Sequence, residues 1–411
     1  MVDNIVVVKF GGSCLSTPDN ILTAAKKIAV EAASGKSVVV VVSALRGDTD
    51  KLLSLAQESS LNNVSKEDLD EILSMGERTT VRLIATALKS QGLNAIAIEP
   101  TTSLWPMYTD SAFGSANVDL EGTEKATTEK LLPLLTKKYV PVVAGFLGLS
   151  PDGKVTTLGR GGSDVSAVIL GRCLDADEVI FVKDVEGVFS ADPKKIINPQ
   201  KIDFLEAEEA YSLVSAGAQV IHPKALMYKQ NSMNLRVVGF NAHNFLGGTL
   251  ITGEVQTDLK VQLRPIPLSM ITLVALRDDS LNVILSLITD VLPSNSKIIG
   301  IALTSGSILL YVENASRLVL SLHEMIKNQG LAKAIHCIDS LAMIVVSGYG
   351  LENIPGVMNA VVSPLSMGNV NLYGVFTISS TIRIFVPYDE GEKALASVKY
   401  VLKKFTRMDG N

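Results

Sequence analysis

Four residues near the N-terminus, Lys9, Phe10, Gly11 and Gly12, combine groups that could hold an anionic ligand. The valine-rich run before Lys9 predicts a buried strand, and the residues after Gly12 have the pattern of a helix start. Glycines let the backbone approach a ligand, a helix start offers unpaired N–H groups, and a lysine adds positive charge. These parts suit the terminal phosphates of a nucleotide, although neither common phosphate-loop spacing is present in KFGG. A tight turn with a solvated lysine explains this short motif equally well.

A second glycine-rich segment, TTLGRGGSDVSA at residues 156–167, combines Arg160 with Asp164. A guanidinium offers a planar pair of donors to a carboxylate, and a carboxylate accepts hydrogen bonds from an ammonium group. The two charges together therefore fit an amino-acid substrate. The alternative, an aspartate N-cap after a glycine loop, explains Asp164 but gives Arg160 no role.

Short β-branched runs alternate with helical patterns over residues 1–250, and these elements would position both loops. The expected strands are 5–8, 37–42, 95–98, 140–144 and 179–182, and the expected helices are 20–33, 69–91 and 165–174. Strands buried on both faces are typical of a mainly parallel sheet covered by helices. Such a sheet binds ligands at the carboxyl ends of its strands.

The C-terminal part of the chain has a different organisation. The polar stretch GEVQTDLKVQLRPIP predicts a linker, and beyond it segments 271–333 and 342–405 share the order strand, helix, strand, strand, helix. This is a weak internal repeat. The expected domains are a catalytic domain over 1–253, a linker over 254–267, and two modules over 268–338 and 339–411.

Composition limits the class of protein. The 411 residues are 47% hydrophobic and 19% charged, with a formal net charge of -5. No dense Lys/Arg block points to nucleic acid or a membrane surface, and no long apolar run or signal pattern is present. We therefore expect a cytoplasmic globular protein whose partners are small molecules or further copies of itself. Its three widely spaced cysteines are expected to be reduced thiols.

Several motifs resemble those of one family. KFGGSC resembles the KFGGTS opening of aspartate kinases, members of the amino-acid kinase superfamily, and TTLGRGGSD is that family's most specific signature. Further motifs follow in the family's order: VVVSALRGDTDKLL, SMGE, TDSAFGSANV, VKDVEGVFSADPK and SAGAQVIHPKAL. The tail resembles paired ACT domains, through GYGLENIPGVMNAV and GNVNLYGVFTISSTIRIFV, although the first module lacks the usual Pro-Gly. Strand exchange between such modules is common in the family.

This resemblance implies an α/β fold and an activity. The fold is an amino-acid-kinase-like sandwich with a mainly parallel central sheet covered by helices, followed by a tandem α+β, ferredoxin-like ACT regulatory domain. The activity is ATP-dependent phosphorylation of the β-carboxylate of L-aspartate to 4-phospho-L-aspartate, the first step towards lysine, threonine and methionine, with Mg²⁺ carried by ATP. A carboxylate with a free pKa of about 3.9 is already ionised at neutral pH, so no general base is needed. Catalysis then consists of positioning plus positive charge.

The resemblance also assigns the aspartate site. The expected substrate-binding residues are Ser43, Thr49, Glu77, Arg160, Ser163 and Asp164. Ser43 and Thr49 border the reacting carboxylate, and Arg160 clamps the α-carboxylate. Glu77 and Asp164 contact the ammonium group, directly or through water. Alternatively, Glu77 is an exposed helix carboxylate.

The nucleotide site follows in the same way. The expected phosphoryl- and nucleotide-binding residues are Lys9, Gly11, Gly12, Ser13, Lys183, Asp184, Phe189, Lys194 and Gln219. Asp184 would orient Lys9 or the phosphates and Phe189 would cover the nucleoside, whereas Lys194 is either a basic contact or a solvated lysine.

Gln219 departs from the family pattern, which usually has a phosphate-facing lysine there. The loss should weaken ATP binding or move the task to Lys183 or Lys224. His222, nearby, is expected to be a packing residue rather than a proton shuttle.

Regulation is the last implication. An effector, lysine or threonine, is expected at Gly348, Gly350, Ile354, Gly356, Asn369 and Asn371, in a homodimer or higher homo-oligomer formed through the ACT domains. Two alternatives stay open: a catalytically weakened amino-acid-sensing subunit, which Gln219 makes conceivable, and a kinase for another acid such as N-acetylglutamate. The second would lack the ACT pair and the ammonium partner in LGRGGSD.

Overall fold

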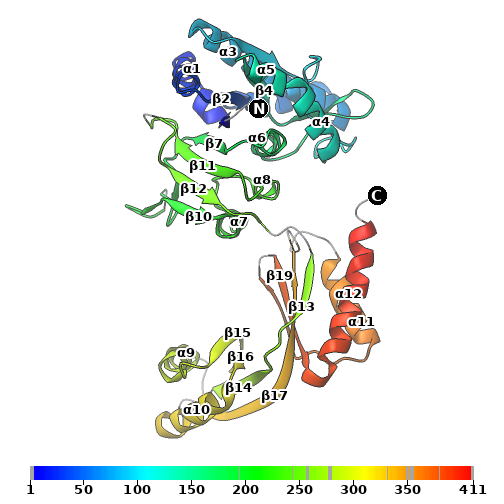
Figure 1. Ribbon diagram of the computed structural model, residues 1–411. Coiled ribbons are helices and arrows are strands. Elements are labelled where there is room, and N and C mark those ends of the chain that lie inside the picture. The colour runs from blue at the N-terminus through cyan, green and yellow to red at the C-terminus, as the bar shows by residue number, and fades with distance from the viewer. Residues whose placement is uncertain are drawn as a thin grey trace. The chain divides into compact units, whose positions relative to one another are not determined.

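The computed structural model describes residues 4–193, 195–242, 244–255, 259–275, 280–330, 332–348, 351, 356–378 and 380–408. The chain forms two compact units, Met1–Gln256 and Thr257–Asn411 (Figure 1). In the described residues, no helix has the length and apolar character needed to cross a membrane.

The first unit is built on an eight-stranded sheet with the order β10-β12-β11-β7-β1-β2-β4-β3. The strands are β1 (Ile5–Phe10), β2 (Ser37–Val42), β3 (Ala95–Ile98), β4 (Val140–Ala144), β7 (Glu178–Lys183), β10 (Phe204–Glu206), β11 (Asn234–Gly239) and β12 (Thr249–Thr252). All neighbours pair in parallel except β11 and β12. Every residue of β1 and β2 is buried, which explains their continuous apolar runs. The five expected strands are confirmed, whereas β10, β11 and β12 were not predicted.

Helices and two short hairpins complete this unit. The helices are α1 (Pro18–Ala33), α2 (Asp48–Ser59), α3 (Lys66–Ser90), α4 (Leu120–Lys130), α5 (Leu132–Thr136), α6 (Gly162–Cys173), α7 (Ala207–Ser215) and α8 (Pro223–Leu226), with a 3₁₀ turn η1 (Gly12–Leu15). The hairpins pair β5 (Leu147–Leu149) with β6 (Val155–Thr157) and β8 (Val188–Phe189) with β9 (Lys201–Ile202). α6 packs against β1 and β7, and α3 packs against β3 and β4. The three expected helices correspond to α1, α3 and α6.

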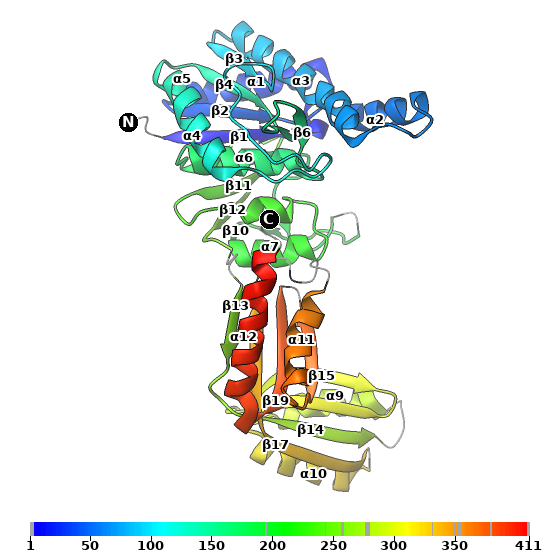
Figure 2. The ribbon, with the colours of Figure 1, turned by 90° about the vertical axis from the view of Figure 1, so that its right-hand side faces the viewer.

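The second unit holds two modules on one antiparallel seven-stranded sheet. Its elements are β13 (Lys260–Leu263), β14 (Leu268–Ala275), α9 (Ser280–Val291), β15 (Lys297–Thr304), β16 (Ser307–Glu313), α10 (Ala315–Gln329), β17 (Ala332–Ser347), α11 (Val357–Met367), β18 (Gly374–Ile378), β19 (Thr381–Pro387), η3 (Tyr388–Glu390) and α12 (Gly391–Met408). The order strand, helix, strand, strand, helix occurs twice. Figure 2 shows α11 and α12 beside the strands of the second module.

The expected linker over 254–267 is wrong for residues 260–263. Lys260–Leu263 form β13, which pairs with Ile344–Ser347 of β17, and Val261 and Leu263 pack on the apolar core of the second module. Four residues of alternating pattern between polar neighbours gave too weak a signal to predict this strand. A strand that precedes the first module in sequence thus completes the sheet of the second.

The expected boundary between residues 338 and 339 falls inside β17. The first part of this strand pairs with β14, and its last part pairs with β13 and β19. The two modules therefore share one continuous strand rather than being joined by a loop.

Candidate active site

Seven of the expected residues line one pocket of about 290 Å³ in the first unit. They are Lys9, Ser43, Thr49, Glu77, Arg160, Ser163 and Asp164. Lys9 lies near the end of β1, Ser43 follows β2, and Phe146, another lining residue, follows β4. The pocket therefore lies at the carboxyl ends of parallel strands, as ligand sites in such sheets do.

A buried cluster of charges forms one wall of the pocket. The Nζ of Lys9 lies 2.7 Å from Oδ1 of Asp164, and both side chains are almost fully buried. The Nζ of Lys183 lies 3.3 Å from Oδ2 of Asp164, and the backbone N–H of His222 donates to the same oxygen at 3.2 Å. Burial opposes ionisation of Asp164, but Lys9 and Lys183 outweigh it and hold its pKa well below the ordinary value. Two cations thus flank one anion.

This cluster differs from the expected division of roles. Asp164 orients Lys9, whereas Asp184, which was expected to orient Lys9 or the phosphates, is exposed. The contacts described for Asp164 are with lysines and a backbone N–H. A contact between Asp164 and the substrate ammonium, and a role of Asp184 at the phosphates, stay predictions.

Glu77 on α3 also lines the pocket. The alternative that it is an exposed carboxylate is wrong, because the residue is only 3% exposed. Its Oε1 accepts a hydrogen bond of 2.9 Å from the N–H of Ala44, and its buried Oε2 has no partner among the described residues. Burial raises the pKa of Glu77 to about 7, against the opposing effects of the Ala44 hydrogen bond and Lys9.

The glycine loop before α6 presents Arg160. Gly159 and Gly161 both have a φ of 73°, and a Cβ on Gly161 would lie 2.2 Å from Cγ of His222. Glycine is therefore required at 161 by conformation and by space. His222 packs on this loop, as expected. Arg160 is exposed at the pocket and takes part in none of the ion pairs formed by the described residues.

The loop after β1 lies against the ends of two neighbouring strands. A Cβ on Gly12 would lie 2.4 Å from the carbonyl oxygen of Ala44, and the N–H of Gly11 donates to the carbonyl of Val182 at 3.4 Å. The thiol of Cys14 donates to the same carbonyl, and burial raises its pKa. Cys14 is thus a packed neutral thiol, while Ser13 is exposed.

Phe189 and Gln219, two further expected nucleotide residues, do not line the pocket. Phe189 is partly buried in β8, and Gln219 is exposed between α7 and α8. Lys194 lies outside the described residues. The nucleotide end of the site therefore remains a prediction.

The expected effector residues belong to the second unit. Gly348 is buried, Gly356 precedes α11 with a φ of 84°, and Asn369 has a φ of 53°. Asn371 is exposed. Gly350 and Ile354 lie outside the described residues.

Sequence reasoning missed Asp70, a second buried carboxylate of α3. It accepts hydrogen bonds from the N–H of Thr157 (2.8 Å), the hydroxyl of Thr157 (2.7 Å) and the N–H of Gly114 (2.9 Å). These bonds tie α3 to β6, the strand that leads into the Arg160 loop. The available signal was its position seven residues before Glu77, which places both on one helix face.

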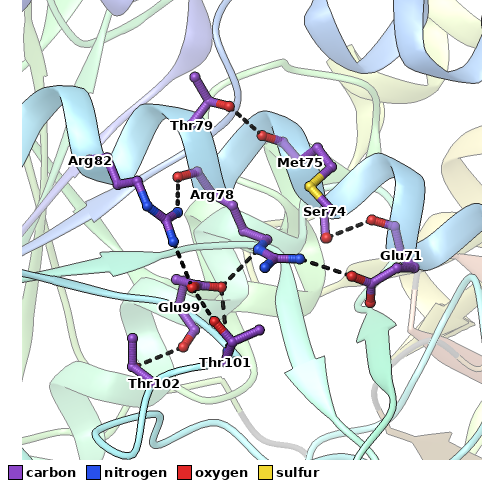
Figure 3. A network of polar contacts seen from close by, with 9 residues as sticks. All are labelled: Glu71, Ser74, Met75, Arg78, Thr79, Arg82, Glu99, Thr101 and Thr102. Carbon is purple, nitrogen blue, oxygen red and sulfur yellow. Dashed lines mark hydrogen bonds and ion pairs between the residues drawn. The ribbon is translucent and has the colours of Figure 1, made fainter.

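Sequence reasoning also missed Glu99, the centre of the network in Figure 3. Its Oε2 lies 2.8 Å from Nε of Arg78, and its Oε1 lies 2.8 Å from Nη2 of Arg82. Burial opposes ionisation of Glu99, but hydrogen bonds from Thr101 and Arg82 outweigh it and lower its pKa. The network fastens α3 to the segment after β3, and so fixes the helix that carries Glu77.

The fold and this pocket together define an amino acid kinase. A family model described as the amino acid kinase family matches residues 4–239. Aspartokinase 2 of Bacillus subtilis (strain 168) is 30% identical over 407 residues, which cover 96% of this chain and 96% of that protein. The chain therefore belongs to the aspartokinases of the amino acid kinase family, which confirms the resemblance read from its motifs.

Solved structures agree with this assignment. The aspartate kinase from Synechocystis has a TM-score of 0.75 at 25% identity, over 96% of this chain and 69% of that one. Escherichia coli aspartokinase III in complex with aspartate and ADP, in its R-state, has a TM-score of 0.57 at 24% identity, over 97% of this chain and 100% of that one. The second likeness supports the fold alone. The expected α/β fold class is confirmed.

Proposed function

We propose that this protein transfers the γ-phosphoryl group of ATP to the β-carboxylate of L-aspartate, giving 4-phospho-L-aspartate and ADP. The observation that carries the proposal is the charge pattern of one pocket. Lys9, Glu77 and Arg160 share its lining. A cation for the transferring group, an acceptor for an ammonium and a donor pair for a carboxylate therefore lie within reach of one small amino acid.

Aspartate binding would use the unpaired groups of the pocket. Arg160 would bind the α-carboxylate through two parallel N–H donors. The unpartnered Oε2 of Glu77 would accept from the α-ammonium. An ammonium beside Glu77 favours its ionised form, so substrate binding offsets the burial that raises its pKa to about 7.

The transfer itself requires little proton chemistry. An oxygen of the ionised β-carboxylate forms a bond to the γ-phosphorus while the bond to the β,γ-bridging oxygen breaks and ADP leaves. Lys9 and the backbone N–H groups of the Gly11–Gly12 loop would stabilise the charge on the transferring group. Magnesium would neutralise phosphate oxygens, and we propose that it arrives with ATP. In the described part of the chain no three His, Cys, Asp or Glu side chains gather as a metal site.

An aspartyl-hydroxamate assay tests this proposal. Purified protein with MgATP should form hydroxamate from L-aspartate, and much less from L-glutamate or N-acetylglutamate, because the latter has no ammonium for Glu77. If N-acetylglutamate were turned over faster than L-aspartate, the proposal that L-aspartate is the substrate would be wrong. Absence of turnover with all three acids, together with measurable binding of an amino acid, would identify a sensing subunit.

We also propose that lysine or threonine regulates the enzyme through the second unit, at residues 348–374. Gly356 precedes α11 with a φ of 84°, and Asn369 and Asn371 are exposed just after the end of that helix. A regulator must bind the less active state more tightly than the active one. Calorimetry on the full chain with each amino acid, alongside the activity assay, tests this. If neither binds, the second unit serves self-association only.

A further inference from the structure

We propose that Lys183 supplies the phosphate-facing charge that the aspartokinase pattern places at residue 219, where this chain has glutamine. The inference rests on the proposed kinase function and adds a residue to its machinery. It concerns the missing lysine before α8 and a lysine that this chain has at the end of β7.

The position of Lys183 places it beside the phosphate loop. It is the last residue of β7, and β7 pairs in parallel with β1 so that Val182 is the partner of Phe10. The N–H of Gly11 and the thiol of Cys14 both donate to the carbonyl of Val182, the residue before Lys183. The backbone of Lys183 thus adjoins the loop proposed to hold the transferring phosphoryl group.

The side chain of Lys183 turns towards the reactive cluster. Its Nζ lies 3.3 Å from Oδ2 of Asp164, and 18% of the side chain remains exposed. Asp164 is already paired with Lys9 at 2.7 Å. One carboxylate therefore faces two ammonium groups, and the surplus positive charge is suited to an anion.

Residue 219 belongs to a loop that converges on the same carboxylate. Gln219 stands three residues before His222, whose N–H donates to Oδ2 of Asp164. Gln219 itself is exposed and forms no hydrogen bond with the described residues. Lys183 reaches Asp164 from β7, and residue 219 belongs to the loop whose His222 contacts the same carboxylate. We infer from this shared contact that a cation at one position can replace a cation at the other.

Lys224 is the weaker candidate for the same task. It is half-buried in α8, and burial lowers its pKa as it lowers the pKa of Lys183, so the pKa does not distinguish the two lysines. None of its described ion pairs or hydrogen bonds reaches Asp164. The geometry therefore favours Lys183.

A charge-relocation experiment tests the inference in the full-length protein. The variants are Lys183→Met, Gln219→Lys and the two combined, with Lys125→Met on the exposed side of α4 as the matched control. We expect Lys183→Met to lower kcat/KM for MgATP by tenfold or more, with a smaller change in the aspartate KM, and the double variant to recover most of the loss. Losing one charged contact in a phosphoryl site has effects on this order.

Three outcomes overturn the proposal: full activity in Lys183→Met, no recovery in the double variant, or a loss in Lys224→Met that Lys183→Met lacks. If Lys183→Met does not fold, Lys183→Arg, which keeps the charge, must retain MgADP affinity while Lys183→Gln loses it. Calorimetry with MgADP separates this inference from the proposed reaction. If the wild type fails to phosphorylate aspartate but the variants rank as expected in MgADP affinity, only the proposed reaction fails.

Discussion

The two units of this protein bury charge very differently. Among the described residues, the buried Lys, Arg, Asp and Glu of the first unit are Lys9, Glu31, Asp70, Glu77, Glu99, Asp164 and Lys229, whereas the second unit has only Glu313. The module cores of the second unit are instead built from aliphatic side chains of β14, β16, β17, β19 and the covering helices. Both units contain a mixed α/β architecture, so fold type alone does not explain the contrast.

The difference indicates where each unit carries its chemistry. Burying an ionised group costs several kcal/mol unless oppositely charged or hydrogen-bonding partners compensate the lost hydration. Removing one partner of a buried ion pair costs on the order of 3–5 kcal/mol. In the first unit the partners are incomplete at Glu77, whose Oε2 is unpaired, and in surplus at Asp164, which faces two lysines. These imbalances suit a site that a charged substrate completes. The aliphatic cores of the second unit show no such imbalance, so the effector site proposed for that unit would have to lie in its loops.

The largest effect is expected from breaking the charged cluster. Lys9→Ala should lower kcat by roughly a hundredfold to a thousandfold, because it removes a preorganised cation from the transferring phosphoryl group. The hydroxamate assay at saturating substrates measures this, and Lys125→Ala serves as the exposed control. Near-normal turnover would show that the buried Lys9–Asp164 pair is only structural.

A second test uses the raised pKa of Glu77. The pKa of Glu77 is about 7 in the folded protein, against an ordinary value of 4.5. The folded state therefore favours the protonated carboxyl. Its contribution to the free energy of unfolding is fully present below pH 4.5 and is lost as the pH rises through 7. Glu77→Gln keeps the Ala44 hydrogen bond without the charge. It should stabilise the first unit at pH 8 by up to about 3 kcal/mol, and hardly at all at pH 4.

Trp105 offers a selective measurement for this test. It is the single tryptophan of the chain and is buried in the first unit, so its fluorescence reports the unfolding of that unit. The same variant should bind aspartate more weakly. In the wild type, kcat/KM for aspartate should rise through pH 7 as Glu77 ionises, and in Glu77→Gln this rise should disappear. Destabilisation at pH 8 would contradict the assignment of Glu77 as a strained binding group.

A third test examines the substrate clamp. Arg160→Ala should raise the aspartate KM roughly tenfold or more while the MgATP KM changes little, because the bidentate contact exists in ground and transition states alike. Arg172→Ala, near the end of α6, the helix that follows the Arg160 loop, is a suitable control. If only the MgATP KM rose, Arg160 would belong to the nucleotide end of the site, and the two ends would have to be assigned the other way round.

The smallest effect on catalysis is expected in the second unit. Arg264 is about one-third exposed and pairs at 2.7 Å with Glu313, which is buried. Arg264→Met leaves that carboxylate without its cation and should therefore cost about 2 kcal/mol of stability, with no loss of activity. Circular dichroism should detect the shift while Trp105 fluorescence and kcat stay unchanged. A loss of activity would mean that this pair serves the catalytic unit and that the contrast between the units is too simple.

Local sequence determined the framework of the catalytic unit. The valine runs of β1 and β2 had to be strands buried on both faces, and the glycines around Arg160 had to form a loop, because these properties belong to each residue and its near neighbours. The motifs also named seven of the residues that line the pocket. They could predict neither Asp70, whose partners Gly114 and Thr157 lie far along the chain, nor Glu99, whose ion pairs depend on how α3 packs against the segment after β3.

Tertiary structure decided the pKa values of the site residues, their ion-pair partners and the pairing of the strands. The choice of Lys9 and Lys183 as partners of Asp164, the burial that raises the pKa of Glu77, and the pairing of β13 with β17 all join segments distant in sequence. Composition gives a carboxylate its ordinary pKa, but the surrounding dielectric and the neighbouring charges set its value in the protein. Those surroundings exist only once the strands and helices have packed, which is why the sequence could name seven residues of the pocket while the fold determined their electrostatics.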